Sequence, residues 1–228
     1  LFSQTYEPSY ATTINNSEVI GRVLFGEPGW TPDDIVNPSE TGEETFPCTG
    51  YSDFTIGNSN LTDGNTTDDV YVKGVQKGFT YELEVQGDFC GSNTNTTNKA
   101  IKVYIDYNDD GDFLDATEDV WTSLYDNGVT PLFTTSITIP LTATSVDGDL
   151  RMRIVYNRPV PGFGVYLWEN LFTPSTLYSF GETEDYTLIL TAYIEAIEAD
   201  SALCFGASDG AITIISDPTA PAGVEYSI

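Results

Sequence analysis

An acidic segment in the middle of the chain carries the strongest chemical signal in the sequence. Residues 106–119 are Asp-Tyr-Asn-Asp-Asp-Gly-Asp-Phe-Leu-Asp-Ala-Thr-Glu-Asp. Side-chain oxygens at alternate positions, followed by a glycine, suit a Ca²⁺ loop, because the ligands converge on one ion while the glycine lets the chain turn sharply. The spacing therefore predicts a calcium site.

The candidate metal ligands are Asp106, Asn108, Asp110, Asp112 and Glu118. Asp112 would contribute its backbone carbonyl, and the Phe113 side chain would anchor the loop to the core. The pattern departs from an EF-hand, because the twelfth position is Thr117 and Glu118 lies one residue further on. Glu118, Asp115 or a distant carboxylate would then complete the shell. The alternative is an Asp/Asn/Gly-rich hairpin that holds no metal.

A second acidic cluster begins at Gly181 and continues as Glu-Thr-Glu-Asp-Tyr. In a strand, Glu182 and Glu184 would share one face and Asp185 would lie on the other. Arg151 and Arg153 also share a face. Two interpretations stay open: a cross-strand pairing of arginine with carboxylate, or a contribution of these carboxylates to the calcium shell.

The overall charge limits the partners of the chain. Thirty-five acidic residues against 8 basic ones give a formal net charge of −27. Such a surface repels nucleic acid, which is bound through Lys and Arg, and it repels anionic lipid. For most of these carboxylates the simplest role is a soluble, self-repelling surface, and divalent-cation binding is the sharper alternative.

Composition also bounds the chemistry. The sequence has no His, which excludes His-based triads and His-ligated zinc. Of the three cysteines, Cys48 and Cys90 could form a disulfide or stay as buried thiols, and Cys204 is left over. Two carboxylates suffice for a glycosidase, but the chain has no nucleophile motif and no phosphate-binding loop. We expect that it is not an enzyme.

Short β-rich runs separated by Gly, Pro, Asn and Asp dominate the elements that would position these residues. Candidate strands span residues 19–25, 51–56, 70–75, 79–85, 100–106, 136–139, 150–156 and 186–193. Alternation is clearest in residues 101–105 and 150–156, and a short turn is expected near residues 31–35. About eight strands predict an all-β fold, an antiparallel β-sandwich of jelly-roll type followed by a partial small β repeat. No apolar run is long enough to span a bilayer, so direct membrane insertion is not expected.

The pattern changes near residue 192. We expect a β-sandwich domain over residues 1–192, with its core from about residue 10, and a linker with an incomplete small repeat over residues 193–228. The last segment is too short to bury a core by itself, so more polypeptide is expected to follow. The start at Leu1 is expected to be a mature N-terminus or the edge of a fragment.

Three ordered motifs resemble the GEVED domain family, named for its Gly-Glu-Val-Glu-Asp motif. They are residues 103–113, residues 151–154 and residues 181–186, with Thr183 in place of the valine. The resemblance covers roughly residues 10–192. Residues 199–214, with Cys-Phe-Gly-x-x-Asp-Gly-x-Ile, are similar to the opening of an SprB repeat, a type named from a gliding-motility adhesin of Bacteroidota.

These resemblances imply a large, extracellular cell-surface protein, secreted by the type IX route, in which this chain is a calcium-stabilised structural or adhesive module. Its partners would be an extracellular surface or polysaccharide, or neighbouring domains of the same polypeptide. A carbohydrate-binding accessory module of a secreted hydrolase is the alternative. Tyr166 and Trp168 would then stack on sugar rings, whereas large aromatics more often fill a core.

Overall fold

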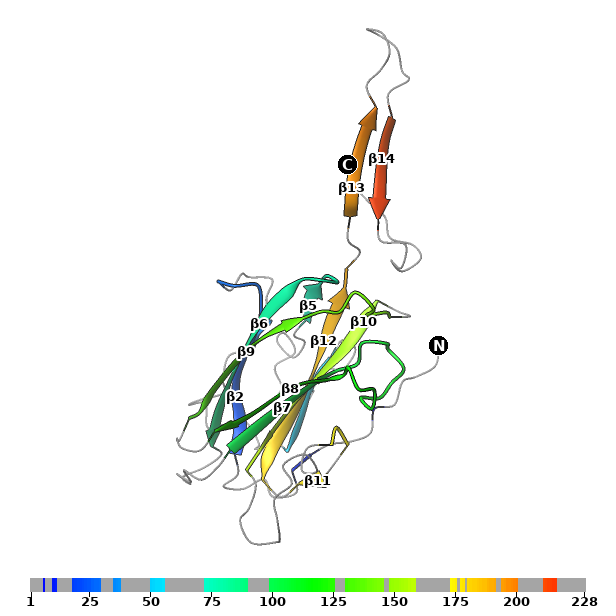
Figure 1. Ribbon diagram of the computed structural model, residues 1–228. Helices are drawn as coiled ribbons and strands as arrows, with labels where there is room; N and C mark the ends of the chain where they lie inside the picture. The colour runs from blue at the N-terminus through cyan, green and yellow to red at the C-terminus, as the bar shows by residue number, and fades with distance from the viewer. Residues whose placement is uncertain are drawn as a thin grey trace, which may run out of the picture.

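The computed structural model describes residues 6, 10–11, 18–29, 35–37, 50–55, 72–89, 99–125, 130–145, 148–158, 173–175, 177–178, 180–191, 194–200 and 211–216. Every regular element within these ranges is a strand, so the predicted all-β class is confirmed (Figure 1). Two larger sheets and two small ones organise the strands.

The first large sheet has four strands in the order β3-β2-β6-β9. These strands are β2 (Glu18–Gly26), β3 (Ile35–Asn37), β6 (Thr80–Phe89) and β9 (Leu132–Thr138). All their pairings are antiparallel. In β6 every second residue is buried, as expected for a strand with one face on the core.

The second large sheet has the order β4-β12-β10-β7-β8, with β5 also paired to β12. Its strands are β4 (Tyr51–Phe54), β5 (Val72–Val75), β7 (Lys99–Ile105), β8 (Asp119–Tyr125), β10 (Asp149–Asn157) and β12 (Gly181–Leu190). The sheet is mixed, because β4 and β5 run parallel to β12 one after the other.

Two short pairs complete the described elements. Strand β1 (Tyr10–Ala11) runs parallel to β11 (Leu177–Tyr178), and β13 (Ile194–Asp200) forms an antiparallel pair with β14 (Ala211–Ser216). The last pair lies in the segment that the sequence assigns to a linker and an incomplete repeat.

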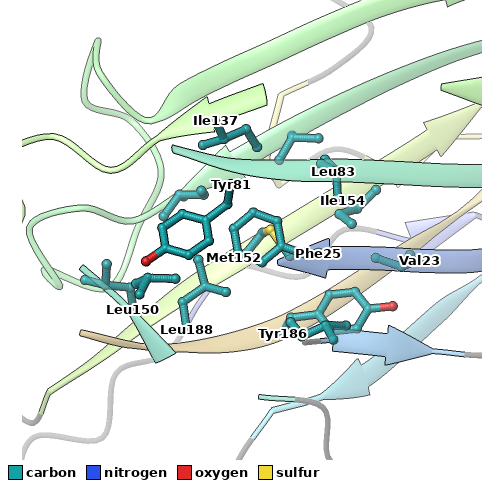
Figure 2. Packing of buried hydrophobic residues seen from close by; sticks show 14 of the residues in the cluster. Val23, Phe25, Tyr81, Leu83, Ile137, Leu150, Met152, Ile154, Tyr186 and Leu188 are labelled. Atoms are coloured by element: carbon teal, nitrogen blue, oxygen red, sulfur yellow. The ribbon is translucent and has the colours of Figure 1, made fainter. Parts of the chain in front are cut away.

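The main core lies between the two large sheets. Figure 2 shows how Phe25 of β2, Leu83 of β6, Met152 of β10 and Tyr186 of β12 pack together. The alternation predicted for residues 101–105 and 150–156 is present, because every second residue of each run is buried in this core: Ile101, Val103 and Ile105, and Leu150, Met152, Ile154 and Tyr156. The predicted β-sandwich is therefore confirmed.

A second apolar cluster covers the outer face of the six-stranded sheet. Its members are Ala100, Tyr104, Phe113, Val155 and Tyr178. They come from β7, β10, β11 and the segment after β7. Strand β7 is therefore buried along its whole length, on both faces. This outer cluster holds the acidic segment in place.

Several predicted element boundaries were wrong. Strand β12 begins at Gly181 rather than at residue 186, so the acidic cluster lies inside a strand. Strand β8 was not predicted, because its first residue ends the acidic segment and its sequence alternates weakly. A short strand, β3, starts at Ile35, the last residue of the segment expected to form a turn.

Candidate functional site

The acidic segment forms the connection between β7 and β8. The Ile105 amide donates to the Glu118 carbonyl at 3.1 Å, and the Asp106 amide donates to the Arg151 carbonyl at 3.0 Å. The thirteen-residue loop 106–118 therefore starts and ends on one hairpin and is also attached to β10. Its carboxylates are positioned by the sheet and not by the loop alone.

Asp106 is the buried centre of the loop. Its carboxylate accepts hydrogen bonds from the amides of Asp109 (2.6 Å) and Gly111 (3.0 Å) and from the Tyr6 hydroxyl (2.8 Å). Burial raises the pKa of Asp106, and these three hydrogen bonds oppose that rise. Asp109 and Gly111 have φ values of 57° and 94°, so the chain turns around the carboxylate through left-handed backbone.

The next ligand candidates lie on the exposed side of the loop. The Asn108 amide group donates to Asp110 at 3.0 Å and to Asp115 at 2.7 Å. Asp110 and Asp112 accept backbone amides two residues further on, at 3.2 Å from the Asp112 amide and 2.8 Å from the Leu114 amide. The Asn108 amide group therefore lies between two carboxylates, where a cation would be favourable.

Glu118 turns back into the loop and is almost fully buried. Its two carboxylate oxygens lie 3.2 Å from the Tyr107 amide and 3.3 Å from the Asp115 amide. Burial, together with the charge of Asp106, raises the pKa of Glu118 to about 7. Glu118 lies one residue beyond the position of the EF-hand glutamate, but its side chain still contacts the backbone of the loop.

The loop is fixed to the sheet through Phe113, as the sequence predicts. The Phe113 ring is 5.1 Å from the ring of Tyr6 and 5.9 Å from that of Tyr104. The guanidinium of Arg153 lies 5.1 Å from the Phe113 centroid, and that of Arg151 lies 4.2 Å from the Tyr6 centroid. Tyr6 thus reaches the site from far away in the sequence, and no sequence signal marks it for this role.

Arg153 and Asp185 form a buried ion pair across β10 and β12. Arg153 donates through Nε and Nη2 to the two Asp185 oxygens, both at 2.7 Å, in a two-pronged arrangement. Arg151 lies 3.2 Å from the same carboxylate, and the Tyr51 hydroxyl donates to it at 2.9 Å. The predicted cross-strand pairing is present, and the described contacts of Asp185 are with these groups rather than with the acidic loop.

The two glutamates of the second cluster face the interior. Glu182 accepts the Ile20 amide of β2 at 2.8 Å and the Ser52 hydroxyl at 3.0 Å, so it links the two large sheets. Glu184 accepts the Tyr186 hydroxyl at 2.6 Å. Glu182 and Glu184 therefore have structural roles in the fold.

The loop contains many negatively charged side chains, but they are not arranged as a metal site among the described residues. Its acidic side chains are Asp106, Asp109, Asp110, Asp112, Asp115 and Glu118, and the segment contains no Lys or Arg. Within the described ranges, no group of three or more His, Cys, Asp or Glu side chains is arranged to hold a metal ion. Several of these carboxylates are instead held by backbone amides of the loop. The segment thus brings Asp106 and Glu118 inward and leaves Asn108 and Asp110 exposed.

The structure describes only some of the remaining aromatic residues and none of the cysteines. Tyr166, Trp168 and the three cysteines lie outside the described residues. Trp121 packs against the main core. Tyr178 is buried, and its hydroxyl is 2.7 Å from that of Thr183.

Comparison with known families finds a match to part of the chain. The GEVED domain model matches residues 100–189. The match includes the acidic loop and all but the last residue of β12. GEVED domains are found in extracellular proteins. No curated protein matches the chain. Among the described residues, no helix has the length and apolar character needed to cross a membrane.

Residues 181–185, Gly-Glu-Thr-Glu-Asp, have structural roles in β12. A Cβ added to Gly181 would lie 1.9 Å from the Tyr156 carbonyl oxygen, and Gly181 has a φ of 136°, so only glycine fits. The first glutamate, Glu182, joins the sheets, and Asp185 holds the two arginines. Strand β12 therefore connects the inner core to the outer face that carries the acidic loop.

Proposed function

We propose that the chain is a calcium-stabilised structural and adhesive module of a large secreted bacterial cell-surface protein. One observation carries the proposal: the loop turns Asp106 and Glu118 inward, buries both, and contains no basic residue. Burial makes ionisation of both carboxylates unfavourable, and the charge of Asp106 adds to this cost at Glu118, so a cation in the loop would stabilise the charged forms.

The chemical type of the candidate ligand atoms fits calcium. Asp106, Asn108, Asp110, Asp112 and Glu118 offer only oxygen, which Ca²⁺ prefers, and the loop has no imidazole or thiolate that would favour zinc. The Asn108 amide group, which bridges Asp110 and Asp115, would turn its oxygen inward when the ion replaces it. Calcium would supply the positive charge that the loop lacks.

Binding to the folded state alone would stabilise the chain by mass action. A free calcium concentration of about 100 times the dissociation constant would contribute about 2.7 kcal/mol. For a chain of this size each kcal/mol shifts the melting temperature by about 2–4 °C, so a rise of about 5–11 °C is expected.

Thermal unfolding with millimolar calcium and with chelator tests the proposal. The Asp110→Asn variant removes one exposed candidate ligand and should lose most of the calcium response. The Asp119→Asn variant is the matched control, because Asp119 pairs with Lys102 at 2.6 Å and lies outside the ligand set. An unchanged melting temperature of the wild type in calcium would overturn the calcium part of the proposal.

The surface location is supported by the GEVED match and by the resemblance of residues 199–214 to an SprB repeat. In this proposal the partners are a polysaccharide, another extracellular surface or neighbouring domains, and the chain has no catalytic role. Antibodies raised against the chain should label intact source cells without permeabilisation. Labelling only after lysis would contradict a surface location.

A further inference from the structure

One end of the sandwich interior contains buried charges instead of apolar side chains. Glu18 of β2 and Lys99 of β7 are both buried, with exposed fractions of 0% and 1%. Arg158, which follows β10, lies with Nε 2.6 Å from a Glu18 oxygen and stacks 4.0 Å from the Phe180 centroid. Lys99 Nζ lies 3.9 Å from the centroid of Phe89. At this end of the core, buried charged side chains therefore pack against the rings of Phe89 and Phe180.

Within the part of the chain that the structure describes, several buried polar atoms at this end have no hydrogen-bond partner. They are both carboxylate oxygens of Glu18, the Tyr156 hydroxyl and Arg158 Nε. Arg158 and Glu18 attract each other as an ion pair, but their atoms are not aligned for a hydrogen bond. Tyr156 is fully buried. Because leaving such groups unpaired is costly, buried polar atoms in folded proteins nearly always have a partner, either protein or ordered water.

The strand register places these atoms close together. Tyr156 pairs with Glu182, whose carboxylate accepts the Ile20 amide of β2. Ile20 pairs with Gly87 of β6, and a Cβ on Gly87 would lie 2.4 Å from the Tyr156 hydroxyl oxygen. Glu18 lies two residues before Ile20 on the same inward-facing side of β2. The hydroxyl of Tyr156 therefore lies against Gly87 of β6, and the strand paired with Gly87 is β2, which carries Glu18.

We propose that this end of the sandwich is a binding site for buried water, which bridges the carboxylate of Glu18 and the hydroxyl of Tyr156. Carboxylate oxygens only accept hydrogen bonds, so the occupant must be a donor. Lys99 and Arg158 balance the buried Glu18 and Glu182, and Asp88, the further acidic group whose charge reaches this end, is partly exposed to solvent. The occupant therefore has to donate a hydrogen bond but needs no ionic charge. A small neutral donor that can also accept is water.

The direction in which one substitution changes the melting temperature tests this site. Tyr156→Phe removes a hydroxyl that water satisfies, and should lower the melting temperature by about 2–4 °C. Tyr186→Phe is the matched control, because the Tyr186 hydroxyl donates directly to Glu184 at 2.6 Å in the same core. A similar loss in both variants supports the site. An unchanged or raised melting temperature for Tyr156→Phe alone would overturn it.

A crystal structure of the unmodified chain at high resolution gives a second test that needs no variant. We expect water density within hydrogen-bonding distance of both the Tyr156 hydroxyl and the Glu18 carboxylate. Direct contact between these two groups, or a protein side chain that fills the space, would contradict the site. Loss of calcium binding would leave this result unaffected, because the two regions share no residue.

Discussion

The ion pair between Arg153 and Asp185 gives the sharpest stability prediction. Asp185→Asn keeps the size of the side chain but removes the charge that faces Arg153. Asp185 and Arg153 have exposed fractions of 0% and 1%. The variant therefore leaves a guanidinium buried without its counter-charge, because water cannot reach it.

The expected cost follows from that burial. Breaking one side of a buried pair costs about 3–5 kcal/mol, since the remaining charge stays desolvated. Asp185 also accepts the Tyr51 hydroxyl at 2.9 Å, and asparagine can retain that contact. With about 2–4 °C for each kcal/mol in a chain of this length, the melting temperature should fall by about 6–20 °C.

Urea unfolding followed by tryptophan fluorescence, together with calorimetric melting, measures the effect. Asp119→Asn is the matched control, because Asp119 forms an ion pair of similar length with Lys102 but its side chain is 49% exposed. Exposed pairs contribute about 0–1 kcal/mol. Equal losses in the two variants would refute the reasoning, because burial would then not determine the cost.

Three other variants test the loop and the strand that supports it. Phe113→Ala should cost about 3–5 kcal/mol in urea unfolding, because a buried aromatic anchor is lost, whereas the adjacent and exposed Leu114→Ala should change stability little. Gly181→Ala should unfold the chain or lower the free energy of unfolding by more than about 4 kcal/mol, because the added Cβ would overlap backbone atoms of β10. Its control is Gly148→Ala: Gly148 has a φ of 90° but open space around the added Cβ, so the loss should be about 1 kcal/mol. Without calcium, the raised pKa of Glu118 means that its contribution to stability is fully present below its ordinary value of 4.5 and is lost as the pH rises to about 7. Melting from pH 4 to pH 8 in chelator should show a smaller decline for Glu118→Gln, and identical profiles would contradict the assigned burial.

The sandwich could be predicted because its core strands alternate. Residues 101–105 and 150–156 place apolar side chains at every second position, and that period follows from strand geometry alone. The start of β12 could not be predicted in the same way. Gly181 and the four residues after it look like a polar turn. They form a buried strand because distant residues supply partners: two arginines of β10 for Asp185, and the Ile20 amide of β2 for Glu182.

In the acidic loop, too, some features could be predicted from neighbouring residues in the sequence and others depend on distant residues. Its turn at Gly111 and the anchor at Phe113 follow from local sequence, and both are present. Tyr6 donates to Asp106 from a hundred residues away, and nothing in its sequence surroundings indicates that contact. The burial of the Asp106 and Glu118 side chains depends on packing against distant residues, and their spacing in the sequence does not determine it.

Isothermal titration of calcium into the chelator-treated chain tests the central claim most directly. We expect one saturable site in the wild type, strong weakening in Asp110→Asn and Glu118→Gln, and unchanged binding in Asp119→Asn. Saturable binding at the loop would support a calcium-stabilised module. No saturable binding at millimolar calcium in the wild type, or equal binding in all four proteins, would contradict it.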